Sequence, residues 1–304
     1  YLARRLKQID SQDVSRFNSV VFNFFLTVNQ FKSIYFSDLS TAVRPGLILF
    51  SALGVLTSCG IGLALSSKLL PREQRGVMTQ GIFRSNFVLI GLYIAETLVP
   101  DGSVGSVAVL GAIVIPLFNV LAVVVLTAYS SEKHLSWRDE VRRIFQNPLI
   151  LGALAGFAAV LLRQLAPSVF DLPQTLPSVY KVCGDLSRAA SPLVLVILGA
   201  RLRFDAVQGL WKKITAAVAM RLVVVPGIVL TLAVLLRDPL GITAEEMPTV
   251  VAIFCSPVAV TSAVMVQEMG GDEQLAQQVV AWSSALSMVT IFCFAAGLRA
   301  MGVM

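Results

Sequence analysis

The chain has 304 residues, of which 56% are apolar and 14% are charged, and its mean hydropathy is +0.78. A soluble domain keeps about a quarter of its residues charged, so this chain has too few charged side chains to cover a water-exposed surface. The formal net charge is +6. The basic residues lie between apolar segments rather than on one polar domain, which excludes a nucleic-acid-binding domain and indicates a membrane protein.

Nine segments are apolar and long enough to cross the hydrocarbon core of a bilayer, which takes about 20 helical residues. We therefore expect an all-α membrane protein. Residues 1–5 resemble the cytoplasmic end of a further span whose apolar body is absent, so nine spans of an expected ten are present. The predicted spans are 17–36, 43–66, 77–99, 104–129, 147–165, 177–200, 214–236, 247–268 and 275–298.

The distribution of Lys and Arg predicts the orientation in the membrane. If residues 1–16 are cytoplasmic, the inner segments contain fifteen Lys and Arg residues and the outer segments contain five. Cytoplasmic loops carry an excess of Lys and Arg. The C-terminus is therefore expected outside, in a multi-pass protein of the plasma membrane, for example the bacterial inner membrane.

The predicted spans repeat along the chain. Those that start near 17, 43, 77 and 104 recur near 177, 214, 247 and 275. With a tenth helix the chain would consist of two five-helix halves, and an odd number of helices in each half inverts one half relative to the other. Inverted repeats are typical of secondary transporters, whose binding sites lie near the bilayer midplane in interrupted helices.

Two segments at equivalent positions of this repeat contain polar or helix-breaking residues, namely 81–91 and 251–262. Pro257 removes a backbone hydrogen bond inside a span, and such a break belongs in a protein interior or a cavity. The helix N-termini that a break creates attract anions. The alternative is that the small residues serve close helix packing and Pro257 makes a kink. The candidate binding residues beside the two breaks are Ser85, Asn86, Ser256, Pro257, Thr261 and Ser262.

Several segments resemble the auxin efflux carrier family, which includes plant auxin exporters and bacterial malate and malonate carriers. Residues 83–91 are similar to the fourth helix of that family, and three later segments resemble its later motifs in the same order: 147–150, 190–199 and 255–260. The resemblance covers nearly the whole chain after the family's first helix. The short loop at 130–146 argues against a long-loop plant exporter and favours the bacterial branch.

This resemblance implies ten helices in two inverted five-helix repeats, with helices four and nine crossing at the midplane, and it implies a homodimer. It places the substrate at Asn86 on one side and at Ser256 and Pro257 on the other. It also implies a scaffold beside a moving transport domain. The scaffold would comprise 1–36 (helix 2, with helix 1 absent) and 147–203 (helices 6 and 7), the transport domain 37–130 and 204–304, and the cytoplasmic loop 131–146.

Four basic residues fall within the predicted spans, where a charge is costly and usually faces a cavity or a partner. Arg84 could bind a substrate carboxylate, or its side chain could extend to the inner headgroups. Arg221 is expected to extend to the headgroups. Lys181, Asp185 and Arg188 lie on one helix face, where they form either a coupling site or an ionic ladder.

The predicted function is secondary transport of a small organic anion by an elevator-type slide, with sodium, proton or membrane-potential coupling left open. The alternatives are a cation/proton or sodium-coupled transporter of related fold and a membrane sensor. An enzyme is not expected, because the only histidine, His134, lies in a polar loop and no phosphate-binding, dinucleotide or metal motif is present. No cofactor is expected. Gly152 and Gly156 form a GxxxG step that indicates close helix packing.

Overall fold

The computed structural model describes residues 10–35, 45–98, 105–130, 137–166, 170–201 and 207–304, and within them the chain is almost entirely helical. Helices occupy all nine predicted spans, and six helices are long and apolar enough to cross a membrane. The prediction of a multi-pass α-helical membrane protein is therefore confirmed. His134 and the rest of 131–136 lie outside the described residues, and the second part of that loop is the amphipathic helix α8 (Trp137–Gln146).

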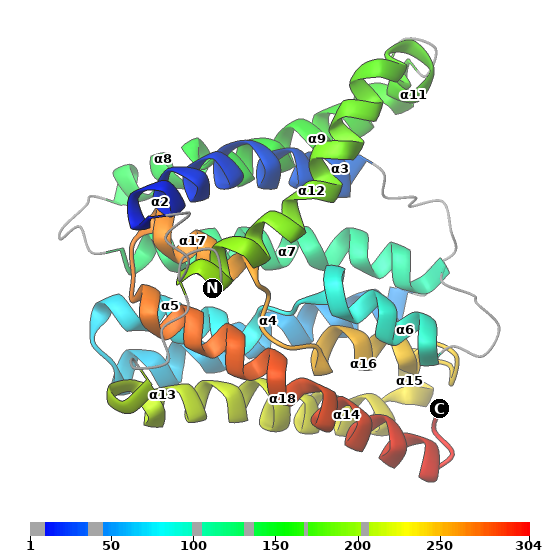
Figure 1. Ribbon diagram of the computed structural model, residues 1–304. Coiled ribbons are helices and arrows are strands. Elements are labelled where there is room, and N and C mark those ends of the chain that lie inside the picture. Colours follow the sequence, from blue (N-terminus) through cyan, green and yellow to red (C-terminus); the bar gives the residue numbers. More distant parts are fainter. Residues whose placement is uncertain (1–9, 36–44, 99–104, 131–136, 167–169, 202–206) are drawn as a thin grey trace.

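One group of helices lies together at the top of Figure 1. Its first member is a continuous helix formed by α2 (Ser11–Val20), η1 (Val21–Leu26) and α3 (Thr27–Tyr35), which Asp10 begins as the N-cap. This helix packs against α9 (Pro148–Leu165) and α12 (Pro177–Arg201), and the short α11 (Leu172–Thr175) precedes α12.

The GxxxG step brings α9 against the first helix of this group. A Cβ atom on Gly152 would lie 2.5 Å from the Thr27 carbonyl oxygen, and one on Gly156 would lie 2.9 Å from that of Phe31. Contacts this short exclude any side chain at either position, so the two glycines let the backbones approach closely. The predicted close packing is confirmed.

Apart from α8, the remaining helices form a second, larger group, in which the same order of elements occurs twice. A long helix is followed by two half-helices and then by another long helix. In the first set these are α4 (Pro45–Leu69), α5 (Arg72–Phe83), η2 with α6 (Phe87–Gly91 and Leu92–Leu98) and α7 (Gly105–Ala128). In the second set the long helix is α13, η4 and α14 (Val207–Ala219, Met220–Val224 and Val225–Leu235), followed after α15 (Arg237–Leu240) by α16 (Met247–Cys255), α17 (Thr261–Met269) and α18 (Glu273–Ala300).

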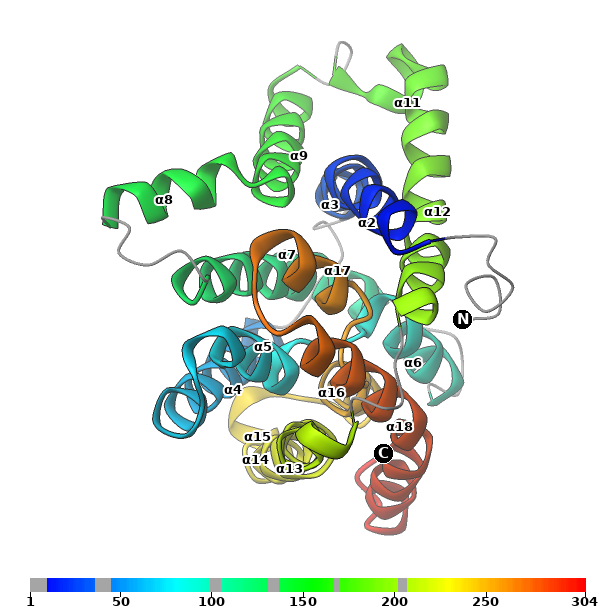
Figure 2. The same ribbon diagram turned by 60° about the vertical axis from the view of Figure 1, so that its left-hand side comes forward.

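Two of the half-helices, α5 and α16, lie in the interior of this second group, while α6 lies at its edge (Figures 1 and 2). Every residue of α16 is buried, and α5 is buried from Gly76 to Phe83. By contrast, α18 exposes large apolar side chains such as Met288 and Phe292. Apolar side chains on the outside are suited to lipid, while the polar breaks are kept in the protein interior.

Candidate functional site

The two interrupted helices meet at their breaks. The backbone leaves the helical conformation at Arg84 and at Ser256, and the two extended segments pair in antiparallel fashion at Ser85 and Val258. The Asn86 N–H donates to the Pro257 carbonyl oxygen at 2.8 Å, and the Ala259 N–H donates to the Arg84 carbonyl oxygen at 3.3 Å. Each break therefore satisfies backbone groups that the other has freed.

A glycine permits this close approach. A Cβ atom on Gly91 would lie 2.9 Å from the Ala252 carbonyl oxygen and 3.1 Å from Ser256 Oγ. Any larger residue at position 91 would push the helix 87–98 away from α16. The Ser256 hydroxyl is turned back onto its own helix, where it donates to the Ala252 carbonyl oxygen.

A cavity lies beside the breaks, between the two groups of helices. The first group contributes Leu26, Asn29, Gln30, Leu149, Ser191 and Val194, and the second contributes 84–89, Ile115, Phe118, Asn119 and 259–261. The first N–H groups of a helix have no partner within it. Those at the start of helix 87–98 therefore lie at the wall of this cavity.

Arg84 is the charged residue of the cavity wall, and its side chain is only 4% exposed. Its guanidinium donates to Asn119 Oδ1 at 2.5 Å, to Ser262 Oγ at 3.3 Å and to Met265 Sδ at 2.8 Å. No carboxylate of the described residues lies within ion-pair distance of it. Arg84 thus does not extend to the headgroups, and a buried positive charge is left uncompensated beside the cavity.

Two further polar groups of the cavity wall lack a hydrogen-bond partner among the described residues. They are the Ser85 hydroxyl and the Gln30 side-chain amide nitrogen, both on side chains at least 95% buried. Gln30 is held by its other amide atom, which accepts a hydrogen bond from Asn119. Unsatisfied buried donors are costly, and these two would be satisfied by an acceptor bound in the cavity.

The predicted binding residues divide into two sets. Four of them line the cavity, namely Arg84, Ser85, Asn86 and Thr261. Ser262 does not line it, but its hydroxyl accepts a hydrogen bond from Arg84. Ser256 and Pro257 do not line it, although they form the second break. Gln30 and Asn119 were not predicted as site residues, although Asn119 is a polar residue within the otherwise apolar helix α7.

The expectation for Arg221 was wrong. Its side chain is 1% exposed, so it does not extend to the membrane surface. Its guanidinium instead lies at the ends of α5 and α16, where it donates to backbone carbonyl oxygens of both helices. The sequence pattern could not indicate this, because carbonyl groups occur at every position of a chain.

Lys181, Asp185 and Arg188 lie away from the cavity, on the exposed part of α12. Asp185 and Arg188 form an ion pair, and their side chains are 55% and 73% exposed. The structure therefore does not bring these three residues to the other candidate site residues.

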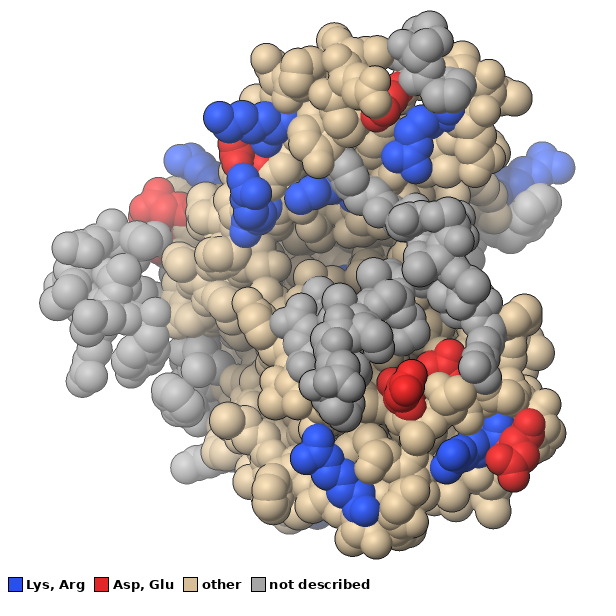
Figure 3. All heavy atoms as spheres, turned by 90° about the vertical axis from the view of Figure 1, so that its right-hand side faces the viewer, with Lys and Arg blue, Asp and Glu red and all other residues tan. Residues whose placement is uncertain are grey.

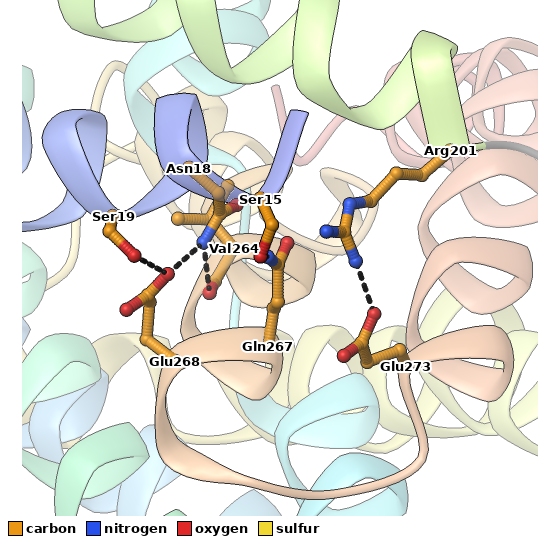
Figure 4. A network of polar contacts seen from close by, with 8 residues as sticks. All are labelled: Ser15, Asn18, Ser19, Arg201, Val264, Gln267, Glu268 and Glu273. Carbon is orange, nitrogen blue, oxygen red and sulfur yellow. Dashed lines mark hydrogen bonds and ion pairs between the residues drawn. The ribbon is translucent and has the colours of Figure 1, made fainter. Parts of the chain in front are cut away.

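A polar network joins the two helix groups at one end of the molecule (Figure 4). The Glu268 carboxylate of α17 accepts hydrogen bonds from Asn18 at 2.6 Å and from Ser19 at 2.8 Å, both on the first helix. Arg201 at the end of α12 forms an ion pair with Glu273 at the start of α18. The face at the opposite end of the molecule is recessed between the two groups (Figure 3).

The described residues contain no group of three or more His, Cys, Asp or Glu side chains that could hold a metal ion. In comparisons with known proteins, a family model described as membrane transport protein matches residues 1–295. No curated protein matches the chain.

Proposed function

The chain belongs to the membrane transport protein family, which is that of the auxin efflux carriers, and on this premise we propose that it carries small organic anions, which bind in the cavity beside the two helix breaks. The observation that carries the proposal is the buried Arg84 guanidinium, which lines the cavity and has only neutral partners. Hydrogen bonds between a guanidinium and a carboxylate are charge-assisted, often bidentate, and strong where water is excluded.

Other features of the cavity wall support an anion rather than a cation. The unpartnered groups of Ser85 and Gln30 are donors, and the start of helix 87–98 adds N–H groups and the positive end of a helix dipole. The described wall contains no Asp or Glu. A cation exchanger would need oxygen ligands or a titratable carboxylate at this place, so the cation/proton alternative has less support.

The position of the cavity supports alternating access by an elevator-type slide. In this proposal, the scaffold consists of the first helix, α9 and α12. The transport domain consists of the interrupted helices and the long helices around them, and its two sets of helices belong to two inverted repeats. The cavity lies between the two parts, so a slide of one past the other would carry a bound anion with it.

The network of Figure 4 would then hold the protein closed at one end. The slide must break the contacts of Glu268 with Asn18 and Ser19 and the ion pair of Arg201 with Glu273, which all join the proposed scaffold to the proposed transport domain. We assign this end to the cytoplasmic side, because the start of α5 and the helix α8, which carry basic residues such as Arg72, Arg75 and Arg142, lie there (Figure 1). The recessed face of Figure 3 would be the outer one.

Uptake into proteoliposomes tests the proposal. Labelled malate, malonate and indole-3-acetate would be offered under imposed sodium, proton or voltage gradients, and at least one is expected to accumulate. Asn86→Ala removes an amide from the cavity wall but keeps the backbone hydrogen bond to Pro257, and should abolish uptake. Asn23→Ala, on the exposed face of the first helix, is the matched control and should transport normally.

Two results would contradict the proposal. One is undiminished uptake by Asn86→Ala, and the other is uptake of none of the anions under any gradient although the protein is folded. A membrane sensor on the same scaffold would bind an anion without moving it, so binding without uptake would favour that alternative.

A further inference from the structure

Two helices that end side by side leave many carbonyl groups without partners. The last four carbonyl groups of a helix have no N–H partner within it. Helix α5 ends at Phe83 and α16 ends at Cys255, and both ends are buried in the protein interior. Water cannot satisfy these carbonyl groups there, so the protein must supply donors.

One side chain supplies them to both helices. Arg221 Nε and Nη2 donate to the Ser256 carbonyl oxygen at 2.9 and 2.7 Å, and Nη2 also donates to that of Ile253 at 3.2 Å. On the other side, Nη1 donates to the carbonyl oxygens of Phe83 at 3.2 Å and Ile82 at 3.4 Å. A guanidinium is suited to this task because its five N–H donors form a rigid planar fork.

The local structure around Arg221 sets this residue apart from its helix. It lies in η4, a π-helical turn within the otherwise α-helical stretch Val207–Leu235. Single π-turns inside α-helices are rare and occur often at functional sites. Arg221 does not line the cavity, so it is not placed to contact a bound anion.

The charge of Arg221 also matches its surroundings. A helix C-terminus carries the equivalent of about −0.5 charge, so two of them together carry about −1. The guanidinium carries +1, and no carboxylate of the described residues forms an ion pair with it. Arg221 therefore compensates the negative helix ends, which would otherwise repel an anion bound nearby.

We infer that Arg221 is a positioning residue for transport, which fixes the two breaks to each other so that they move as one rigid unit. This inference rests on the proposed transport function. It predicts that the antiparallel contact between Ser85 and Val258 persists through the whole transport cycle, while the contacts of the transport domain with the scaffold change.

A disulfide tests the rigid unit without changing Arg221. Ser85 and Val258 face each other as a pair flanked by hydrogen bonds, a geometry in which side chains are close enough for a disulfide. The transport rate of the double variant Ser85→Cys, Val258→Cys would be measured in its oxidised and in its reduced form. Mass spectrometry would identify the disulfide. Because Ser85 lines the cavity, the two forms are compared at saturating anion concentration, and we expect equal maximal rates. Arrest of transport on oxidation, with recovery on reduction, would overturn the inference.

Arg221 variants test the role of the side chain. In the double-cysteine background, Arg221→Lys keeps the charge but loses the fork, and Arg221→Gln loses both. We expect the disulfide to form more slowly, by about tenfold in Arg221→Lys and by more in Arg221→Gln, and the KM for the anion to rise. Arg188→Lys, on the exposed surface of α12, is the control and should change neither.

The two readouts separate this inference from the proposed function, because disulfide formation needs no substrate. Slower disulfide formation in a protein that moves no anion would refute the transport proposal and leave Arg221 as the residue that fixes the breaks. Normal disulfide formation and normal KM in Arg221→Lys would refute the inference, whatever the protein transports.

Discussion

Two buried arginines lie at the same pair of helix breaks, and their partners differ. Arg221 makes five hydrogen bonds, all to backbone carbonyl oxygens at two helix C-termini. Arg84 contacts three neutral side chains and lies at the wall of the cavity. The helix ends balance the charge of Arg221, while nothing among the described residues balances that of Arg84.

This difference shows that burial alone does not identify a binding cation. Both side chains are almost inaccessible, at 4% and 1% exposure, and neither has a carboxylate partner in the described part of the chain. The two differ in the group that supplies the compensating negative charge. For Arg221 it comes from the backbone carbonyl groups at the two helix C-termini, and in our proposal for Arg84 it comes only from the transported anion.

The largest expected effect is that of reversing the charge at Arg84. Arg84→Glu would place a carboxylate opposite the carboxylate of the anion, and like charges in contact cost several kcal/mol. Uptake in proteoliposomes should fall by about 100-fold or more, which corresponds to about 2.7 kcal/mol. Arg84→Lys keeps the charge without the fork and should give an intermediate rate. Equal uptake rates for Arg84→Glu and Arg84→Lys would show that the charge of Arg84 does not bind the anion, and the proposed difference between Arg84 and Arg221 would be wrong.

Two buried serines provide a smaller and sharper test. The Ser85 hydroxyl has no partner within the described part of the chain, whereas the Ser283 hydroxyl accepts from the Val258 N–H and donates to the Val280 carbonyl oxygen. Ser85→Ala should raise the KM by about threefold to tenfold without lowering the melting temperature, because it removes an unsatisfied buried group. Ser283→Ala should lower stability by about 1 kcal/mol and leave the KM unchanged. A lower melting temperature for Ser85→Ala would show that its hydroxyl has a structural role.

The sequence predicted the helices and the positions of both breaks. Apolar length located the spans, and Pro257 with the polar run around Asn86 marked the interruptions. The partners of Arg221 could not be predicted, because they are backbone atoms as far as 139 positions away in the sequence. Asn119 did carry a signal, since it is an isolated amide in an apolar helix, whereas Gln30 lies in a polar stretch and carried none. Only the fold shows that Asn119 contacts both Arg84 and Gln30.

The smallest effect is expected for the charged residues of α12. The ion pair between Asp185 and Arg188 is exposed, and such pairs contribute about 0.2–1 kcal/mol. Asp185→Asn, Arg188→Gln and Lys181→Gln should each keep uptake within about twofold of wild type. A complete loss of sodium- or proton-dependent uptake in any of them would instead identify these residues as a coupling site.

The central claim is that the cavity selects negative charge through Arg84, and thermal stabilisation of the purified protein by ligands tests it most directly. Malonate, malate and indole-3-acetate would each be compared with the neutral amide of the same shape, in wild type and in Arg84→Gln. The account predicts that at least one of these anions raises the melting temperature of wild type, that its amide does not, and that Arg84→Gln responds to neither. Equal stabilisation by an anion and its amide, or an unchanged response in Arg84→Gln, would contradict it.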